Sequence, residues 1–398
     1  MAAHTVIVIA DALVSWSLHQ RNAPIAARER VAASVPQAVE RGALALVTCH
    51  RIEVFAALPA DADPRAWLRG SSGAGPELDA LSLRMGGAAV THLFRVAAGL
   101  DSVIPGERQI LGQLRRAYAD RGTRLPSLLS AAVEHALHHG RVLRAGTALG
   151  SVTRSIGSLA VDELLRKVPE PTQASVLVVG AGEIGKLAIR ALRRRVGRIL
   201  VASRSGESAE RAAAVVDGEA VALAEIARAI WAADGVISAA DTRGGVLSAG
   251  LLAARVARGP LVVVDIAMPR SVAADARSLD GLTYRSVDDL GSEATVSGEV
   301  IAACEEACRV AATRFIDETA ARDAVPVIAA LQAHADRLRR RQLDRALAKL
   351  GHLSERDRDV VAGLAQALAR GLVHEPTAAL RSKPSRAGAA RDLFGIEQ

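Results

Sequence analysis

A glycine-rich turn between an apolar strand and a helical segment is the feature that most constrains how this chain can fold. The apolar run 176–179 leads into Gly180-Ala-Gly182-Glu-Ile-Gly185, which fits the pattern G-x-G-x-x-G. In that context Gly180 permits a tight turn, Gly182 lets the backbone approach a pyrophosphate at the helix N-terminus, and Gly185 lets helix and strand pack closely. The turn predicts a dinucleotide site; a glycine turn without a cofactor is the less favoured alternative. The predicted cofactor contacts are Gly180, Ala181, Gly182, Glu183, Ile184 and Gly185.

The end of the next predicted strand indicates which dinucleotide binds. Where an NAD-binding chain places an acidic residue on the ribose, about 20 residues after the glycines, this chain has Ser203-Arg204-Ser205. A carboxylate would repel a 2′-phosphate, whereas a guanidinium and hydroxyls can bind one. We therefore predict NADPH as the cofactor, with Ser203, Arg204 and Ser205 as contacts. The alternative is that Arg204 is one surface arginine among many.

Three regions follow one another along the chain, and we place their boundaries at 1–150, 151–290 and 291–398. The predicted strands are 5–9, 43–47, 53–57, 176–179, 199–202, 235–238 and 261–265. The first region adds a helix at 27–40 and helical spacing over 78–166, whereas the second alternates strands with helices, as a parallel α/β unit does. The third is helical, with one long helix expected over 292–319 and another beginning at Pro326. The fold class is therefore a multidomain α/β protein.

The helical third region carries a stripe of leucines. Two or three helices bury little apolar surface by themselves, so we expect the stripe to pack against a second copy of the chain. Packing within one chain is an equally open alternative. A capping box at Ser354-Glu-Arg-Asp357 predicts the start of the last long helix. The stripe consists of Leu331, Leu338, Leu343, Leu347 and Leu350.

Composition narrows the classes of protein that remain. With 398 residues, of which 50% are apolar, the chain is not wholly disordered, and 2% aromatic residues exclude widespread base-stacking platforms. A formal charge of +7 favours acidic partners only weakly. The three cysteines show no framework spacing, which indicates a reducing compartment. Without an evident targeting or membrane segment, we expect a cytoplasmic protein that does not enter a membrane.

Cys49 is the candidate nucleophile. It follows a predicted strand and is flanked by His50 and Arg51, two potential cations that could lower the pKa of the thiol. A thiol that becomes acylated forms a thioester, whose activated carbonyl can accept a hydride. A packed, inert thiol stays open as the alternative on this evidence. Cys304 and Cys308 lie one helical turn apart without further ligands in view, so we predict helix packing there and no metal site.

Several long motifs resemble the glutamyl-tRNA reductase family. The segment Thr48-Cys-His-Arg-Ile-Glu53 is similar to the family's T-C-N-R-x-E. The segments His92-Leu-Phe-Arg-Val-Ala-Ala-Gly-Leu-Asp-Ser102 and Gly106-Glu-Arg-Gln-Ile-Leu-Gly-Gln113 are similar to H-L-x-R-V-A-x-G-L-D-S and G-E-P-Q-I-L-G-Q. Later blocks that resemble the family, in the expected order, are Val264-Asp-Ile-Ala-Met-Pro-Arg270, Ser286-Val-Asp-Asp-Leu290 and Leu372-Val-His-Glu-Pro376.

The resemblance implies an NADPH-dependent enzyme of 5-aminolevulinate and porphyrin synthesis. In this reading Cys49 attacks glutamyl-tRNA(Glu), tRNA leaves, and hydride reduces the thioester to glutamate-1-semialdehyde, while His92 donates or accepts a proton. It also implies a small α+β catalytic domain, a Rossmann-type NADP domain and a long spine helix with an all-α homodimerisation domain. A complex with glutamate-1-semialdehyde aminomutase is a further possibility. The implied substrate-binding residues are Thr48, His50, Arg51, Ser102, Glu107, Arg108, Gln109 and Gln113.

Three departures from the family pattern lie in the first region. His50 stands where Asn is usual, Arg108 where Pro is usual, and the N-terminal G-x-x-H-K/R-x-A-P stretch is loosened to Leu18-His-Gln-Arg-Asn-Ala-Pro24. They concern the substrate pocket more than the chemistry. Two alternative functions therefore stay open. One is a non-catalytic homologue that binds glutamyl-tRNA or a pathway partner, and the other is an NADP oxidoreductase of the shikimate dehydrogenase type.

Overall fold

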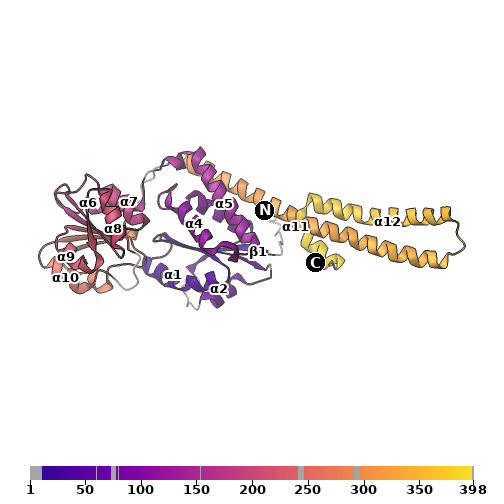
Figure 1. Ribbon diagram of the computed structural model, residues 1–398, viewed down its shortest axis with the longest axis horizontal. Helices are drawn as coiled ribbons and strands as arrows, with labels where there is room; N and C mark the ends of the chain where they lie inside the picture. Colours follow the sequence, from indigo (N-terminus) through magenta and orange to yellow (C-terminus); the bar gives the residue numbers. More distant parts are fainter. Residues whose placement is uncertain are drawn as a thin grey trace.

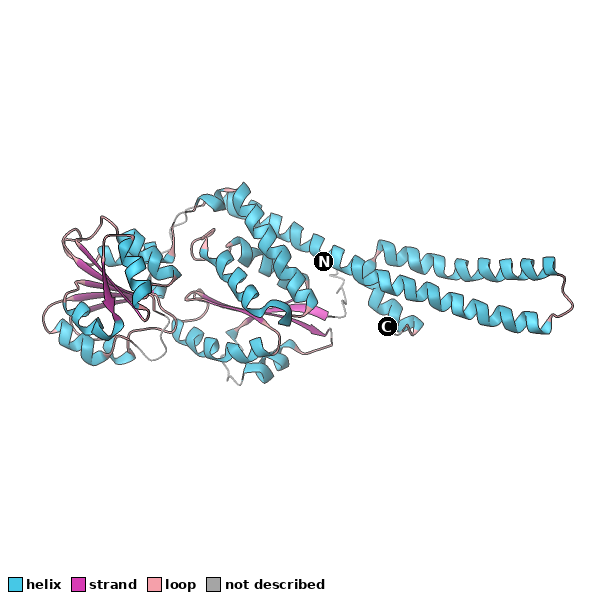
Figure 2. Ribbon diagram, viewed as in Figure 1, coloured by secondary structure: helices cyan, strands magenta, loops and turns pink. Residues whose placement is uncertain are grey.

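Two sheets and a long helical extension follow one another along the described chain (Figures 1 and 2). The structure is a computed structural model that describes residues 11–59, 61–72, 78, 80–152, 154–240, 246–290 and 296–396. The strand expected at 5–9 lies outside the described residues. No described helix is long and apolar enough to cross a membrane.

The first sheet is antiparallel, with strand order β2-β3-β1-β4. Its strands are β1 (Asp11–His19), β2 (Leu44–Val47), β3 (Arg51–Pro59) and β4 (Ser82–Met85). Helices α1 (Ile25–Glu40) and α2 (Pro64–Ser72) cover one face, and α3 (Gly87–Ala98), α4 (Gln109–Arg121) and α5 (Ser127–Gly146) cover the other (Figure 1). Strands β1 and β4 were not predicted. The helical spacing expected over 78–166 is wrong for β4, which pairs with β1 at the sheet edge.

The period of two along β1 and β3 gives this sheet one apolar face and one mixed face, on which Leu13 and Phe55 are buried beside polar side chains. Trp16 of β1 and Val54 of β3 point into the core beneath α1 and α2. The alternate residues include Ser17, His19 and Glu53, which lie on the opposite face. Polar side chains are thus buried inside the first region, on the face that α3 covers.

The second sheet is parallel throughout, with strand order β10-β9-β8-β5-β6-β7. This is the doubly wound order of dinucleotide-binding folds, in which ligands bind where the order reverses, here between β5 and β8. All four strands predicted in this region are confirmed, and β8 and β9 match the predicted bounds. The strands are β5 (Ser175–Val179), β6 (Arg198–Ser203), β7 (Glu219–Ala222), β8 (Gly235–Ser238), β9 (Leu261–Asp265) and β10 (Leu282–Ser286).

Helices pack on both faces of this sheet. Val176 and Val178 pack on one side, and Leu177 and Val179 on the other, so that β5 is apolar in both directions. The helices are α6 (Ile156–Leu165), α7 (Glu183–Leu192), α8 (Gly206–Ala214), α9 (Ile226–Trp231) and α10 (Ala249–Val256).

One helix, α11 (Gly298–Lys349), runs for 52 residues and joins the first region to the helical extension. Its first half packs on α3 and α5, where Cys304 and Cys308 are buried and the rings of Phe94 and Phe315 lie 6.4 Å apart. The packing role predicted for the two cysteines is confirmed. The expected break at Pro326 is wrong. The helix continues because Val327 beside it packs against the last helices of the chain, which offsets the hydrogen bond that proline cannot donate.

The extension is completed by α12 (Glu355–Ser382) and α13 (Ala387–Phe394). Half of the predicted capping box is present, since the Ser354 hydroxyl accepts the N–H of Asp357 at 3.2 Å. The Asp357 carboxylate accepts the Ser354 hydroxyl at 2.6 Å, so the reciprocal bond to the Ser354 N–H does not form. Leu331 of the leucine stripe is buried within the chain, and Leu343, Leu347 and Leu350 are half-buried. The stripe is therefore already partly covered by its own chain.

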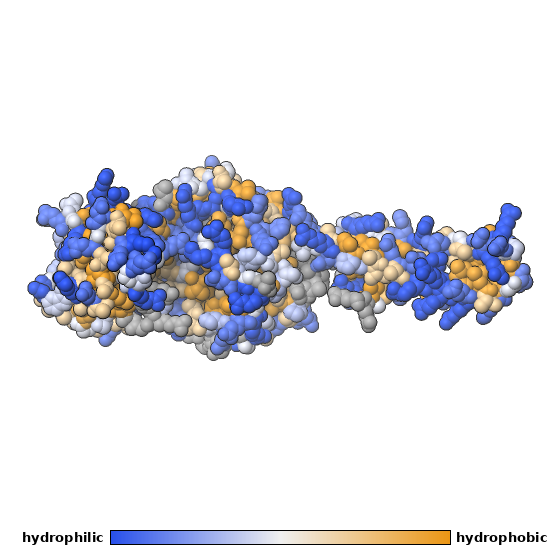
Figure 3. Space-filling view, in the orientation of Figure 1, coloured by the Kyte–Doolittle hydropathy of each residue, from blue (hydrophilic) through white to orange (hydrophobic). Residues whose placement is uncertain are grey.

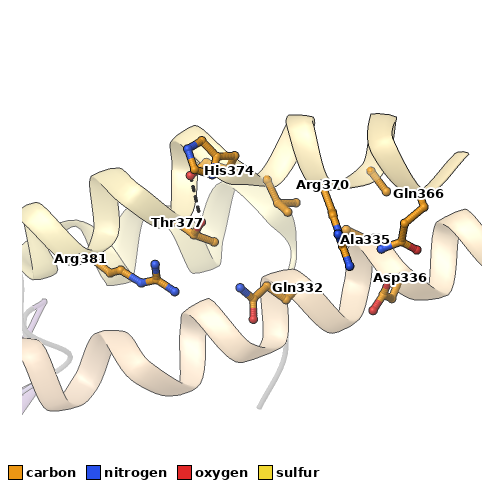
Figure 4. Close-up of a pocket in the computed structure, with 10 residues that line it drawn as sticks. Gln332, Ala335, Asp336, Gln366, Arg370, His374, Thr377 and Arg381 are labelled. Carbon is orange, nitrogen blue, oxygen red and sulfur yellow. Dashed lines mark hydrogen bonds between the residues drawn. The ribbon is translucent and has the colours of Figure 1, made fainter. Parts of the chain in front are cut away.

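A cavity of about 420 Å³ lies between α11 and α12 (Figure 4). Polar side chains from both helices line it, among them Asp336, Arg370 and His374. It belongs to the extension, away from both sheets, so it includes neither the glycine-rich turn nor Cys49 (Figure 1).

Candidate active site

Cys49 lies in the tight turn of the β2–β3 hairpin. The Thr48 hydroxyl accepts the N–H groups of His50 at 3.3 Å and Arg51 at 3.2 Å, and the Thr48 N–H donates to the Arg51 carbonyl at 2.8 Å. The His50 carbonyl accepts the Gln20 N–H at 2.9 Å. The break that the sequence predicts after residue 47 is thus a hairpin turn. It is held by its own hydrogen bonds through Thr48 and by the hydrogen bond from Gln20 to His50.

The environment of the thiol differs from the one predicted. Cys49 is buried, and burial, reinforced by the Glu107 charge, raises its pKa to about 12. Burial, together with the charges of Arg28 and Arg51, lowers the pKa of His50 to about 3, so His50 is neutral. The prediction that His50 and Arg51 together lower the pKa of the thiol is wrong. The cation that favours the thiolate is Arg28, which also donates to the Cys49 carbonyl.

Glu53 is a buried carboxylate on the face of the sheet that α3 covers, and polar side chains surround it. Its Oε2 lies 2.7 Å from Nε2 of His92 on α3, and its Oε1 lies 3.0 Å from Nε2 of His19 on β1. The Arg51 guanidinium follows at 3.6 Å. Although burial opposes ionisation, these cationic and hydrogen-bonding partners lower the pKa of Glu53 to about 2.

His92 is held between two carboxylates. Its Nδ1 lies 3.5 Å from the Asp101 carboxylate, which Arg95 binds at 2.9 Å. Burial disfavours the imidazolium, but Glu53 and Asp101 outweigh it and raise the pKa of His92. The His92 and Arg95 partners hold the pKa of Asp101 well below its ordinary value. The imidazolium form of His92 is thus favoured by its two carboxylate partners.

The donor atoms of His19, Glu53 and His92 also lie within 4.8 Å of one another, the spacing of a possible metal site. Zn²⁺ at about 2.0–2.1 Å from its ligands would hold them more than about 3 Å apart. The contacts of 2.7 and 3.0 Å are hydrogen-bond distances instead. We therefore interpret the cluster as an ionic network.

Glu107 occupies a second buried position near Cys49. Its carbonyl accepts Nη1 of Arg144 at 2.6 Å. Burial raises the pKa of the Glu107 carboxyl, and the charges of Arg51 and Arg144 and the Ser102 hydroxyl counter this only in part. Arg51, Ser102 and Glu107 therefore come together, as the sequence motifs imply.

The other predicted substrate-binding residues differ in how deeply they are buried. Gln109 is buried and its Oε1 has no partner among the described residues, and Gln113 is half-buried on α4. Arg108 is exposed and donates to the Gly150 carbonyl at 3.1 Å, so it does not join the buried cluster. The sequence interpretation missed Arg28, His19, Glu53, Asp101 and Arg144.

The glycine-rich turn fits a dinucleotide. Gly180 has φ +106°, and a Cβ there would lie 2.7 Å from the Ala239 carbonyl of the neighbouring β8 segment. A Cβ on Gly185 would lie 1.9 Å from the Gly180 carbonyl, whereas one on Gly182 would meet nothing within 4 Å. Open space thus lies before the N-terminus of α7, where a pyrophosphate is expected. Arg204 is exposed at the end of β6, and Ser205 caps α8 by accepting the Ser208 N–H at 3.3 Å.

We expect His92 to titrate above its ordinary pKa of 6.5. Neutralising Glu53 by Glu53→Gln should lower that pKa, because the variant removes the largest favourable charge; Glu305→Gln, which does not contact His92, should not. The measurement is NMR titration of histidine-labelled protein. By linkage, the stability that His92 contributes is present below pH 6.5 and is lost as pH rises through its raised pKa. A wild-type pKa below 6.5 would contradict the network.

Comparison with known proteins shows which protein families the chain resembles. Family models match for "Glutamyl-tRNAGlu reductase, N-terminal domain" over residues 16–147, "Shikimate / quinate 5-dehydrogenase" over 162–293, and "Glutamyl-tRNAGlu reductase, dimerisation domain" over 303–396. The second match is to a nucleotide-binding domain, which agrees with the β5–β10 sheet.

Similar proteins cover almost the whole chain. Glutamyl-tRNA reductase of Myxococcus xanthus is 34% identical over 96% of this chain and 94% of its own length. Glutamyl-tRNA reductase 2 of Anaeromyxobacter dehalogenans is 35% identical over 96% and 91%. The solved glutamyl-tRNA reductase of Methanopyrus kandleri is 28% identical, with a TM-score of 0.50 over 96% and 97% of the two chains. The chain belongs to the glutamyl-tRNA reductase family.

Proposed function

We propose that this chain reduces glutamyl-tRNA(Glu) to glutamate-1-semialdehyde with NADPH, the first step towards 5-aminolevulinate and porphyrins. The observation that carries the proposal is a buried cysteine in a fixed hairpin turn, in a region that also holds a histidine clamped by two carboxylates. We assign residues 1–150 to glutamyl-tRNA binding and catalysis, 151–290 to NADP binding, and 291–398 to the spine helix and dimerisation.

The first step transfers the glutamyl group. The Cys49 sulfur bonds to the ester carbonyl carbon, the bond to the tRNA oxygen breaks, and the thiol proton ends on the released tRNA hydroxyl. Because the thiol has a pKa of about 12, it is protonated until substrate arrives. We therefore expect proton loss to accompany the attack rather than to precede it.

The second step reduces the Cys49 thioester. The turn Gly180–Gly185 with Ser203, Arg204 and Ser205 would hold NADPH, which would supply a hydride to the thioester carbonyl carbon. The carbon–sulfur bond breaks, and the departing thiolate needs a proton. His92 is suited to donate a proton, since Glu53 and Asp101 raise its pKa and stabilise its imidazolium form.

Charge complementarity assigns the groups of the glutamyl moiety. Arg51, buried beside Glu53, is suited to pair with the side-chain carboxylate, and Glu107 with the α-ammonium. Ser102, Gln109, Gln113, Thr48 and the neutral His50 complete the pocket in this proposal. The exposed Arg108 is better placed to contact tRNA than the glutamyl group.

The alternative functions are less favoured. A shikimate-type dehydrogenase accounts for the match at 162–293 only, whereas the two reductase matches cover the remaining regions. A non-catalytic homologue has no need for both the cysteine turn and the glycine cradle. We further propose a cytoplasmic protein that uses glutamyl-tRNA as its substrate and passes its product to an aminomutase.

A homodimer through the C-terminal helices is the proposed assembly. Figure 3 shows apolar surface exposed along the extension between charged stretches. Four residues at intervals of four on α12 present such a face, with exposed fractions of 60–77%. They are Val360, Leu364, Leu368 and Leu372. This face, more than the partly covered Leu331–Leu350 stripe, is available to a second copy.

The function is tested on Cys49. Incubated with glutamyl-tRNA and without NADPH, the wild type should accumulate a hydroxylamine-sensitive glutamyl adduct on the Cys49 peptide, detected by mass spectrometry. Cys49→Ser should lose the adduct and tRNA-dependent NADPH oxidation, since a hydroxyl without a strong base is a poor nucleophile. Cys304→Ala should retain both. Turnover by Cys49→Ser would refute the mechanism.

Cofactor choice is tested on Arg204. Arg204→Ala should weaken NADPH binding by about 1.5–3 kcal/mol, the range for a hydrogen bond to a charged group, and leave NADH binding unchanged. Arg211→Ala, on the exposed surface of the next helix, serves as the control. Fluorescence titration gives both dissociation constants. Equal wild-type affinity for NADPH and NADH would overturn this assignment.

Assembly is tested on α12. Leu364→Glu combined with Leu368→Glu should convert the dimer to a monomer at micromolar concentration, because carboxylates are costly to bury in an apolar interface. Val215→Glu, an exposed position outside the extension, should leave it dimeric. Light scattering after gel filtration gives the mass. A monomeric wild type, or a dimeric double variant, would contradict the proposal.

A further inference from the structure

Charged side chains of α1 join the region that carries Cys49 to the nucleotide-binding region. Arg28 donates to the Asp288 carboxylate, and the Ile25 N–H donates to the same carboxylate at 3.1 Å. The next residue, Glu29, accepts from Arg270 at 2.8 and 3.0 Å from the guanidinium and at 2.7 Å from the backbone N–H. Two adjacent residues of α1 thus form ion pairs of opposite polarity with one partner region.

Asp288 also completes the first turn of α1. The residue at the N-cap is Pro24, which makes no side-chain cap. The Asp288 carboxylate takes that place by accepting the Ile25 N–H, and its negative charge lies at the positive end of the helix. A residue 263 positions along the chain therefore caps α1.

Both partners on the nucleotide side are held in place. The turn that presents Asp288 is fixed by Ser286 and Asp289, since the Asp289 carboxylate accepts the Ser286 N–H at 2.6 Å and its hydroxyl at 2.8 Å. The loop of Arg270 is tied to buried Asp265, whose carboxylate accepts the N–H groups of Ser271 at 2.9 Å and Val272 at 3.0 Å. These contacts involve the segments 264–270 and 286–290, which resemble family motifs and have no role in the proposed reaction.

Arg28 also contacts the turn that holds Cys49. Its side chain is fully buried, and while one nitrogen binds Asp288, the other donates to the carbonyl of Cys49. A guanidinium is planar and rigid, so fixing one nitrogen orients the other. The hairpin turn therefore has a hydrogen bond whose geometry depends on where the nucleotide-binding region sits.

We propose that Arg28 is a positioning residue: its bridge from Asp288 to the Cys49 carbonyl makes the hairpin turn hold its reactive geometry only while the nucleotide-binding region is docked on α1. The Glu29–Arg270 pair secures the same docking without touching the turn. Separation of the two regions releases the turn and exposes the thiol. The catalytic consequence rests on the proposed function, whereas the coupling itself does not.

The test measures how fast iodoacetamide alkylates each cysteine in the full-length protein, without tRNA or NADPH. Asp288→Ala should accelerate Cys49 alkylation by about tenfold or more, as local opening does. Glu29→Arg should do the same, because it repels Arg270 and undocks the regions while Arg28 stays intact. Adding Arg270→Glu to Glu29→Arg restores the pair with reversed charges and should return the rate towards that of the wild type.

Internal and matched controls separate coupling from general loosening. Cys304 and Cys308 are buried in the core and should stay unreactive in every variant. Arg116→Gln breaks another contact between the same regions, the exposed pair with Glu183, and should leave Cys49 alkylation unchanged. If the proposed function holds, acyl transfer from glutamyl-tRNA should fall in both single variants and recover in the reversed pair.

Three results would overturn the proposal. Cys49 alkylation unchanged by both single variants would show that docking does not hold the turn. A parallel rise at Cys304 and Cys308 would show that the variants loosen the whole fold. A reversed pair as reactive as Glu29→Arg alone would show that the ion pair is not what matters. Absence of glutamyl-tRNA reduction by the wild type would instead refute the proposed function and leave the alkylation result standing.

Discussion

A carboxylate with no exposed surface, Glu53, is the constraint around which the first region is built. A buried charge is tolerated only when cations or hydrogen-bond donors surround it. His19, Arg51 and His92 supply them from two strands and a helix. Because removing any one partner leaves the charge less compensated, the two strands and α3 are fixed relative to one another. The same carboxylate favours the protonated form of His92.

Beyond the sheet, His92 is the first of four side chains that contact one another in series and alternate between basic and acidic. His92 contacts Asp101, Asp101 binds Arg95, and Arg95 binds Glu305 at 3.0 Å. Glu305 lies on α11, so the string ends on the helix that leads to the extension. The outermost pair is partly exposed and contributes little to stability, whereas the inner members are buried and set the protonation of His92. The buried members of this series of charges therefore affect the pKa of His92, whereas the exposed pair at its end does not.

Local signals in the sequence were read correctly where one segment determines the outcome. The tight turn at Gly180, Gly182 and Gly185 and the four inner strands of the second sheet are of this kind, since turn geometry and apolar runs are local. The edge strands β7 and β10 were not predicted, because neither is a buried apolar run. Period-two alternation could also have placed Glu53 on the face of Arg51. Asp288 at the start of α1 carries no such signal, because its partner lies 263 residues away. The continuation of α11 past Pro326 likewise depends on packing against α12 and α13.

The misjudged property of Cys49 has the same origin. His50 and Arg51 follow Cys49 in the sequence, and we predicted that both would be cations beside the thiol. Burial lowers the pKa of His50, so that its imidazole is neutral. The cation that favours the thiolate is instead Arg28 of α1. A thiol with a pKa of about 12 reacts slowly with oxidants and adventitious electrophiles, since the thiolate is the reactive form. An aminoacyl ester differs from them, because its leaving tRNA oxygen can take up the thiol proton. In the proposed reaction, burial would thus make Cys49 selective for a substrate that accepts its proton, whereas a thiolate exposed in the free enzyme would not be selective.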